Sequence, residues 1–337
     1  MLEKLVRGTA KVSRRVFLAI TAVVVAVVLG IAAILRLRRP PPAPTPTPTP
    51  ETPPTAPPPT PPKADITVVR VDKAPIRNPD DPVWGRVPEV EFSLGPQAMV
   101  APFKLAPTIT SVKVKAVRDE EWIAFRLEWS DKEANFRNFD VHEFRDACAV
   151  MLLSYPIPQE KLGLAWQMGT PEYPATMLFW RADWQLEVEK GYQDITDIFP
   201  NMAVDVYPPY KGTVEEVEPK PKKLGTVAGE LRYLGGFATG NPMVRLEKKT
   251  PVEKLIARGP GTIESFKTQD AEGWGKFEGG RWRVVIAKKL KASDAGQGEI
   301  EVKPGSFYHI AIAVWQGSEG DRGSRKAITP LKLMYVE

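Results

Sequence analysis

The residues with the clearest chemical potential lie in a turn at positions 166–171, which leads directly into the aromatic-rich stretch 175–184. The turn holds the thioether of Met168 next to a glycine and close to a proline. A buried planar cofactor such as haem needs a ligand atom of this kind beside flat apolar surface. A second turn, rich in glycine and charged residues, lies at positions 317–326 and offers a candidate partner ligand. This pair of turns is the strongest functional signal in the chain.

The chain has 337 residues and a formal net charge of +5, but the excess positive charge is concentrated at its N-terminal end. Eight lysines and arginines and one glutamate lie in the first 39 positions, which leaves a net charge of about −2 for residues 40–337. A folded part that is close to neutral lacks the basic surface that nucleic-acid binding requires. We therefore expect no nucleic acid among the partners.

Cys148 is the only cysteine in the chain, and this excludes several kinds of site. One cysteine cannot form an intrachain disulfide, a cysteine-based zinc site or a four-cysteine iron–sulfur cluster. The covalent haem-attachment sequence Cys-x-x-Cys-His is also absent, so any haem must be held non-covalently, as haem b. Cys148 lies in an apolar run at positions 147–153, where we expect it to be a small buried hydrophobic residue.

The first 63 residues predict a membrane anchor and a spacer. A basic segment, residues 1–15, ends in Ser13-Arg14-Arg15, which is similar to a twin-arginine export signal, although paired arginines also commonly flank a membrane span. Residues 16–39 begin with 20 uncharged positions, enough to cross a bilayer about 30 Å thick, and end in arginines rather than a cleavage site. Residues 40–63 are mostly proline, threonine and alanine and favour an extended spacer. We expect residues 64–337 to fold as one extracytoplasmic domain on a single-pass anchor in the cell membrane.

After residue 64 the sequence shows the alternation of apolar and polar residues that is typical of β-strands. Positions 112–117 and 122–129 alternate on either side of a charged turn and predict a hairpin. Further runs of this kind lie at 146–153, 175–184, 281–287, 307–315 and 331–336. Helical periodicity is scarce. Many short strands joined by long loops predict an all-β domain, an antiparallel β-sandwich whose loops at one end or edge hold the ligand.

Six motifs occur in an order that is similar to one protein family. They are Arg145-Asp146-Ala147-Cys148-Ala149-Val150, Met168-Gly169, Phe179-Trp180-Arg181-Ala182-Asp183-Trp184-Gln185, Gly240-Asn241-Pro242, Gly279-Gly280-Arg281-Trp282-Arg283-Val284-Val285 and Ala313-Val314-Trp315-Gln316-Gly317. Together with the expected sandwich, they resemble the haem b-binding γ subunits of the ethylbenzene dehydrogenase and dimethyl sulfide dehydrogenase type, within the type II DMSO reductase family. The resemblance covers about residue 65 to the C-terminus. It implies a sandwich resembling family 9 carbohydrate-binding modules.

The resemblance also implies one b-type haem whose iron is ligated axially by a methionine and a lysine. It maps these ligands onto Met168, in the Met-Gly turn, and Lys326, in the turn that follows the Val-Trp strand. Other cations in the C-terminal third compete with Lys326 for this role, namely Lys288, Lys289, Lys291, Arg325 and Lys332. Gln316 departs from the family pattern, in which we expect an acidic residue, and this change should affect a loop contact more than iron ligation.

A methionine and lysine pair suits electron transfer. Iron with both axial positions filled by protein has no open coordination site for a substrate. A lysine must lose its proton before its amine can bind iron, and burial assists because it lowers the pKa of an ammonium group. We therefore expect an apolar, aromatic pocket, and Trp166, Phe179 and Trp180 are the candidates for its wall.

The two histidines are alternative iron ligands, since imidazole is a common ligand of haem. His142 precedes the strand expected at 146–153 and is the substitute if Lys326 does not bind iron. His309 lies inside the strand expected at 307–315, where a structural role is favoured.

Two functions from different classes account for these features. In the first, the protein is a membrane-anchored, extracytoplasmic b-type cytochrome that exchanges electrons with a molybdenum catalytic subunit and an iron–sulfur subunit, partners that the resemblance implies. It would not be an enzyme on its own, because the sequence has no nucleophile elbow, phosphate loop, dinucleotide fingerprint or zinc-protease motif. In the second, it is an extracytoplasmic carbohydrate-binding module without haem, which uses surface tryptophans as sugar platforms. The two turns that carry Met168 and Lys326 favour the first.

Overall fold

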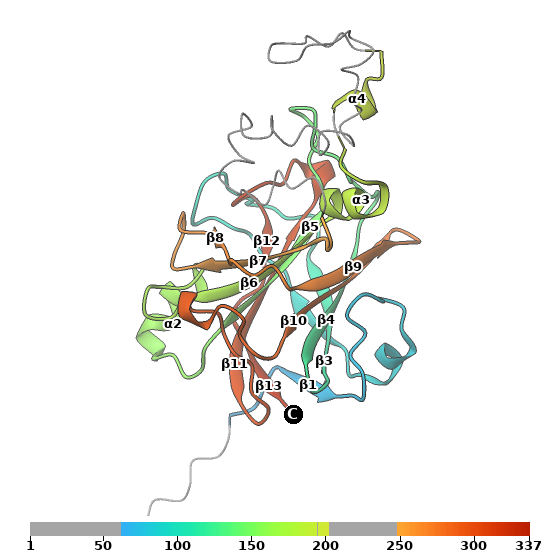
Figure 1. Cartoon of the computed structure of the whole chain (residues 1–337). Helices are drawn as coiled ribbons and strands as arrows, with labels where there is room; N and C mark the ends of the chain where they lie inside the picture. The colour runs from blue at the N-terminus through green and yellow to red at the C-terminus, as the bar shows by residue number, and fades with distance from the viewer. Residues whose placement is uncertain (1–61, 194, 202–247) are drawn as a thin grey trace, which may run out of the picture. The chain divides into compact units, whose positions relative to one another are not determined.

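Two β-sheets that share one strand form the folded domain (Figure 1). The computed structural model describes residues 62–193, 195–201 and 248–337. The first sheet has the order β8 (Glu264–Ser265), β7 (Val252–Ala257), β6 (Ala175–Arg181), β5 (Ala147–Leu153), β11 (Phe307–Trp315) and β13 (Lys332–Val336), with β12 (Ala327–Ile328) paired to β11. The second sheet has the order β3 (Ser111–Arg118), β4 (Trp122–Ser130), β10 (Arg281–Lys289) and β9 (Glu272–Phe277), with β2 (Val90–Ser93) paired to β3. The shared strand, β1 (Ile66–Arg70), pairs with β13 and then with β3.

Helices are few in the part of the chain that the structure describes. They are α2 (Gln159–Trp166), α3 (Ala182–Lys190) and α4 (Ile195–Ile198), with short 3-10 turns at η1 (Pro82–Arg86), η5 (Ala295–Gln297) and η6 (Gly317–Glu319). The mostly β architecture confirms the predicted all-β class.

The predicted hairpin is present as β3 and β4. The two strands are antiparallel, and Val117 lies opposite Ala124 across the turn. The carboxylate of Asp119 fixes this turn, because its Oδ1 accepts the backbone N–H of Glu121 (2.8 Å) and of Trp122 (2.7 Å). An aspartate that bonds to the backbone two and three residues ahead is a common way to close a tight turn.

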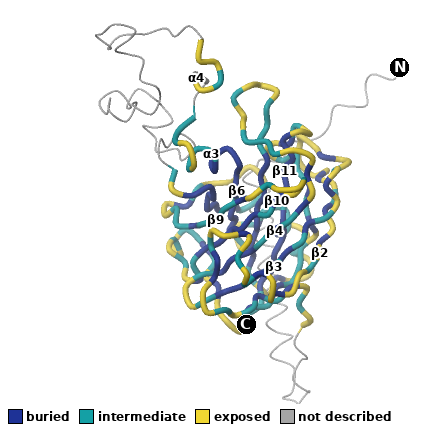
Figure 2. Tube along the Cα trace, turned by 90° about the vertical axis from the view of Figure 1, so that its right-hand side faces the viewer, coloured by how far each residue is buried: buried dark blue, intermediate teal, exposed yellow. Residues whose placement is uncertain are grey.

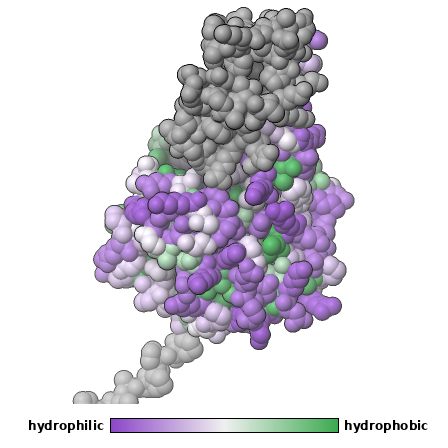
Figure 3. Space-filling model, in the orientation of Figure 1, coloured by the Kyte–Doolittle hydropathy of each residue, from purple (hydrophilic) through white to green (hydrophobic). Residues whose placement is uncertain are grey.

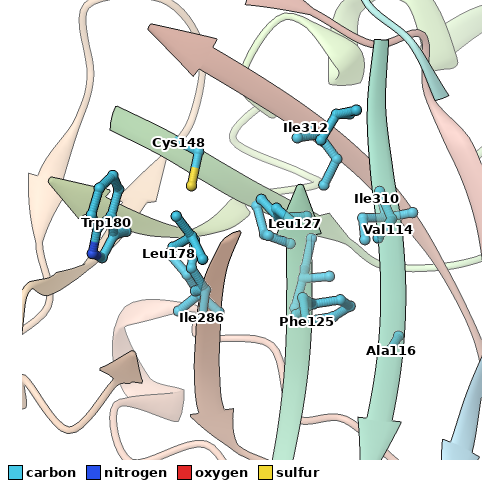
Figure 4. Close-up of a cluster of buried hydrophobic side chains, with 14 of the residues drawn as sticks. Val114, Ala116, Phe125, Leu127, Cys148, Leu178, Trp180, Ile286, Ile310 and Ile312 are labelled. Atoms are coloured by element: carbon cyan, nitrogen blue, oxygen red, sulfur yellow. The ribbon is translucent and has the colours of Figure 1, made fainter. Parts of the chain in front are cut away.

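The core fills the space between the two sheets. Alternate residues of each strand point inward, so Phe125 and Leu127 of β4 pack with Val150 of β5 and Ile310 of β11, all with no exposed surface. Figure 4 shows Phe125, Leu127 and Ile310 together with Cys148, which is fully buried as expected. The tube in Figure 2 shows the same division, with buried strands in the centre and exposed turns at the ends. In Figure 3 the described surface in view is mainly hydrophilic, broken by small separate hydrophobic areas.

The structure differs from the sequence prediction in two details. The sandwich is not purely antiparallel, because β1 runs parallel to both β13 and β3. The stretch 175–184 is not one strand, because β6 ends at Arg181 and α3 begins at the next residue. The backbone N–H of Ala182 donates to the carbonyl of Asp146 (3.1 Å), and Asp183 places an acidic side chain in the first turn of the helix, where it is stabilising.

The predictions for the N-terminal region concern residues that the structure does not describe. The basic segment 1–15, the anchor 16–39 and the spacer 40–63 up to residue 61 lie outside the described ranges, and so does the motif Gly240-Asn241-Pro242. Among the helices of the described ranges, none combines the length and apolar character needed to cross a bilayer.

Asp146 is a fully buried carboxylate that ties two loops to the core. Its Oδ2 accepts the indole N–H of Trp282 (3.0 Å) and the backbone N–H of Asn135 (2.7 Å), and its Oδ1 accepts the backbone N–H of Gly317 (2.8 Å). Burial raises the pKa of Asp146 to about 7, while these hydrogen bonds act in the opposite direction.

The raised pKa predicts that part of the folding stability is lost as the pH rises. Below the ordinary pKa of 3.8 the carboxyl is protonated in both states, and between that value and about 7 only the folded protein keeps the proton. The stabilisation from this group is therefore full below about pH 4 and decreases toward pH 7, by an amount on the order of 2–4 kcal/mol. Asp146→Asn cannot titrate, so its free energy of unfolding in urea should depend less on pH over this range. Identical pH slopes for the variant and the wild type would contradict the prediction.

Candidate functional site

An apolar cleft lies on the outer face of the first sheet, on the side of β5, β6 and β11 that does not face the sandwich core. Its empty volume is about 660 Å³, which includes space open to solvent. The walls come mainly from loops, with one residue each from α2 and β12, and are formed by Gln97, Met99, Val100, Trp166, Gln167, Met168, Pro260, Ser324, Lys326, Ile328 and Thr329. We expected the site among loops at one end or edge of the sandwich, and the cleft lies instead on the face of a sheet, with loops around it.

The floor of the cleft is formed by alternate residues of three adjacent strands. They are Ala149 and Met151 of β5, Met177 of β6, and Ala311 and Ala313 of β11. Successive side chains of a strand point to opposite faces, so the residues between them, such as Val150 and Leu178, belong to the core. Three of the five floor residues are alanines, which leave the surface shallow. A flat apolar ligand matches such a floor.

Met168 lies in a turn directly after α2, on the side of the cleft formed by β6 and β7. It is the one non-glycine residue with a positive φ (70°) among the described residues. The backbone N–H of Gly169 donates to the carbonyl of Ala165 (2.7 Å), and that of Gly259 donates to the carbonyl of Met168 (3.0 Å). Left-handed backbone at such a residue costs about 1–3 kcal/mol and is found where a side chain must point in one direction, often at binding sites.

Lys326 lies on the other side of the cleft, directly before β12. Its Nζ is 4.8 Å from the centre of the Trp315 ring, and no carboxylate in the described part of the chain pairs with it. Burial lowers the pKa of Lys326 to about 8. The cleft therefore brings together a soft thioether and an amine that loses its proton more readily than an exposed lysine does.

Trp166 connects the two sides of the cleft. Its indole N–H donates to the carbonyl of Thr329 (3.0 Å), which follows β12. The side chain of Thr329 in turn accepts the backbone N–H of Ile312 on β11 (2.9 Å). The wall that carries Met168 is thereby bonded to the segment that carries Lys326.

The structure brings three of the five predicted site residues into this cleft, namely Met168, Lys326 and Trp166. Phe179 does not line it but packs against Trp315, with the ring centres 4.8 Å apart. Trp180 lies elsewhere, because the neighbouring position on a strand faces the other way. Its ring is fully buried in the core, where Figure 4 shows it beside Cys148 and Leu178. It packs against Trp282, with 5.0 Å between ring centres. Trp315, and not Trp180, lines the cleft.

Neither histidine lines the cleft. His142 is exposed and borders a separate polar cavity formed by residues 133–137, 142–144 and 317–320. His309 is buried on β11, two positions before Ala311, with its Nε2 unbonded and its pKa lowered by burial. The competing cations are also elsewhere. Lys288, Lys289, Arg325 and Lys332 pair with Glu299, Glu121, Asp321 and Asp65, and Lys291 is exposed.

Gln316 makes a contact between loops. Its Nε2 donates to Asp131 (3.1 Å) and its Oε1 accepts the hydroxyl of Thr108 (2.5 Å). A carboxylate at this position would face the carboxylate of Asp131. The glutamine therefore changes a contact between two loops, as expected from the sequence.

Several cleft residues were not identified from the sequence. Four methionines line the cleft, namely Met99, Met151, Met168 and Met177, and only one of them was proposed. Met151 and Met177 could have been found, because alternation on β5 and β6 places them on the same face and in register with each other. No sequence pattern identifies Met99 and Gln97 as cleft residues, because their loop is distant in sequence from the other segments that line the cleft.

Comparison with known proteins gives a family and one related sequence. The sequence model of the family described as ethylbenzene dehydrogenase matches residues 81–327. A candidate haem subunit of respiratory nitrate reductase from Haloferax mediterranei is 23% identical over 253 residues. That alignment covers 75% of this chain and 66% of the relative, so the chain spans just under two thirds of the relative's length.

Comparison with solved structures gives carbohydrate-binding proteins that have low similarity to this chain. A family 9 carbohydrate-binding module from Caldicellulosiruptor kristjanssonii in complex with glucose has a TM-score of 0.34 and 9% identity, covering 81% of this chain and 95% of that one. A candidate carbohydrate-binding protein from Bacteroides uniformis has a TM-score of 0.38 and 8% identity, covering 81% and 98%. Likeness at this level has no bearing on the function.

Gly169→Ala should destabilise the turn that carries Met168. A Cβ at this position would lie 2.7 Å from the nitrogen of Ala175 and 2.8 Å from the carbonyl oxygen of Ala257, and the φ of +80° disfavours any side chain. We expect a loss of about 2–4 kcal/mol in the free energy of unfolding in urea. Gly163→Ala is the control, because a Cβ there meets nothing within 4 Å in α2 and should stabilise by about 0.5–1 kcal/mol. Equal effects of the two variants would contradict the prediction.

Lys326→Met should stabilise the protein in the absence of any cofactor. The variant removes an ammonium group that has no carboxylate partner in the described structure, and we expect a gain of about 1–3 kcal/mol at pH 7. Because the folded pKa (about 8) lies below the ordinary value of 10.5, wild-type stability should approach that of the variant as the pH rises through this interval. Exposed Lys267→Met is the control and should change little. A Lys326→Met protein that unfolds more readily than wild type would refute the argument.

Proposed function

Because this chain belongs to the ethylbenzene dehydrogenase family of haem-binding subunits, we propose that its cleft holds one non-covalent b-type haem with Met168 and Lys326 as the axial ligands of the iron. The observation that carries this proposal is that the two side chains line one apolar cleft from different sides. In sheet order, the turn of Met168 contacts the ends of β6 and β7, whereas Lys326 adjoins β12, with β5 and β11 between them.

The donor set fits a haem iron. A thioether and a neutral amine are both ligands that iron accepts, and the depressed pKa of Lys326 lowers the free energy needed to remove its proton. The alanine floor and the indoles of Trp166 and Trp315 supply the flat apolar surface that a macrocycle needs. When bound, the haem supplies a one-electron couple at an iron that has no open site for substrate.

The residues of the cleft have separate tasks in this proposal. Met168 donates a neutral sulfur, which favours reduced iron and raises the reduction potential. The apolar lining lowers the pKa of Lys326 to about 8, so that its neutral amine is reached at a lower pH than in an exposed lysine. The cleft is open to solvent, and we propose that haem enters through this open side, where Met99 and Val100 are exposed.

We further propose that the protein passes electrons between redox partners and is not catalytic alone. The Haloferax relative is described as a haem subunit of respiratory nitrate reductase, which supports a role as one subunit of an oxidoreductase. By resemblance, the partners are a molybdenum catalytic subunit and an iron–sulfur subunit. The apolar segment 16–39 and the proline-rich segment 40–63 support a single-pass anchor in the cell membrane, with the folded domain outside the cytoplasm.

The alternative, a carbohydrate-binding module, receives no support from the positions of the tryptophans. All nine tryptophans lie within the described ranges, and each is buried or half-buried. A sugar platform needs an exposed aromatic face.

Absorption spectra of the full chain, produced with sufficient haem, test the proposal. Wild-type protein should show a low-spin b-type spectrum, and Met168→Ala and Lys326→Ala should each lose it, through conversion to high-spin iron or a decrease of at least about tenfold in haem affinity. Met177→Leu is a matched control, because Met177 lines the same cleft without being a proposed ligand, and it should keep the low-spin spectrum. Colourless wild-type protein, or an unchanged spectrum in Met168→Ala, would refute the proposal. Colourless protein that binds polysaccharide would favour the alternative.

A further inference from the structure

Two loops meet beside the cleft. In the first loop, polar side chains are buried and an apolar side chain is exposed. Residues 97–104 form a closed loop, because Gln97 and Lys104 each donate a backbone N–H to the other's carbonyl (2.9 Å). These two polar residues are 3% and 2% exposed, whereas Met99 between them is 41% exposed. Buried polar groups must have partners, and some of the partners here lie in the second loop, residues 316–326.

The side-chain amide of Gln97 uses all of its hydrogen-bonding capacity. Its Oε1 accepts the backbone N–H of Met99 (2.7 Å) and of Val100 (2.9 Å). Its Nε2 donates to the carbonyl of Val100 (2.7 Å) and to that of Ser324 (2.7 Å), with a longer contact to the carbonyl of Pro102 (3.5 Å), so four short bonds remain. A primary amide has two N–H donors and an oxygen with two lone pairs, so each is engaged. Three bonds shape the first loop, and the fourth crosses to the second loop, two residues before Lys326.

Contacts on both sides of Ser324 reinforce this crossing. The ammonium of Lys104 bonds to both carboxylate oxygens of Asp321 (2.9 and 3.0 Å), and the two side chains are 2% and 1% exposed. The guanidinium of Arg325 donates to the carbonyl of Phe103 (2.9 Å). Separating the two charges of a buried ion pair is strongly unfavourable. We therefore expect the two loops to move as one unit.

We propose that Gln97 is a positioning residue for Lys326, whose backbone it fixes through Ser324 so that the amine faces the cleft. A free lysine side chain and its loop would lose conformational entropy on binding a ligand, and a loop that is already fixed loses less. Gln97 bonds to backbone groups and acts on the amine through the loop. The role of this positioning in iron ligation rests on the proposed function, whereas the coupling of the two loops does not.

Amide hydrogen exchange in the haem-free full chain tests the coupling. Gln97→Met should speed exchange at residues 322–328 by at least about fivefold, the factor expected for loss of one net hydrogen bond. Gln97→Glu keeps the acceptor for Met99 and Val100 but loses the donor to Ser324, and it should give the same result. Gln269→Met is the matched control, since that amide also joins backbone groups, donating to Lys254 (2.8 Å) and Phe266 (2.7 Å), and does not line the cleft. Unchanged exchange at 322–328 in both Gln97 variants would overturn the proposal.

Displacement by imidazole in the haem-loaded protein tests the consequence for ligation. Imidazole must replace an axial ligand, so the concentration at half displacement measures how firmly that ligand is held. It should fall about five- to tenfold in Gln97→Met and stay within about twofold of wild type in Gln269→Met. A loaded protein whose midpoint is the same in Gln97→Met and wild type would overturn the positioning role. Full chain that takes up no haem would refute the proposed function, and the exchange experiment would still decide the coupling.

Discussion

The amine of Lys326 faces an apolar cleft with no carboxylate beside it in the described structure, and much of the site is arranged around this unfavourable placement. In low-dielectric surroundings an ammonium without a counterion is destabilised relative to the neutral amine. The ring of Trp315 compensates only in part, since a cation above an aromatic face gains about 0.5–2 kcal/mol. Folding therefore gains little from this lysine, and its placement supports the proposal that the amine binds a ligand in the cleft. The loops around it hold it against the tendency to turn toward water.

The first sheet can carry such a site because it is buried on both faces. All seven residues of β5 are buried, with one set in the sandwich core and the other beneath α2 and the cleft. The strand consequently reads as a continuous apolar run, as strands covered on both sides do. The second set includes small residues, which leave room above the sheet, and the loops at the borders of this face then supply the polar and ligating groups.

The elements that the sequence predicted well are those in which local pattern and tertiary position agree. Strict alternation at 122–129 marked a strand with one face in the core, and the Met168-Gly169 pair marked a turn whose backbone does have positive φ at both residues. The prediction for Trp180 did not match because adjacent aromatic residues on β6 point to opposite faces that are both apolar. Periodicity cannot tell which of two apolar faces is the core.

Other features depend on contacts between distant segments, which one sequence does not reveal. The parallel pairing of β1 arises from its position between β13 and β3, and the start of α3 depends on a bond to Asp146. The contribution of Gln97 to the cleft depends on a loop more than 200 positions away, with the bond to Ser324 spanning 227 residues. By contrast, Met151 and Met177 followed the alternation of their strands and were accessible to sequence reasoning.

The separation between the core and the cleft has a consequence for the order of assembly. The inner faces of the strands close the sandwich without the floor alanines or the side chains of Met168 and Lys326. The domain can therefore reach its native topology before a prosthetic group arrives, and that group can be added to, or withdrawn from, an already finished scaffold. Maturation would then depend on delivery of the prosthetic group to the open side of the folded sheet. A shortage of that group would leave folded, colourless protein and not misfolded protein.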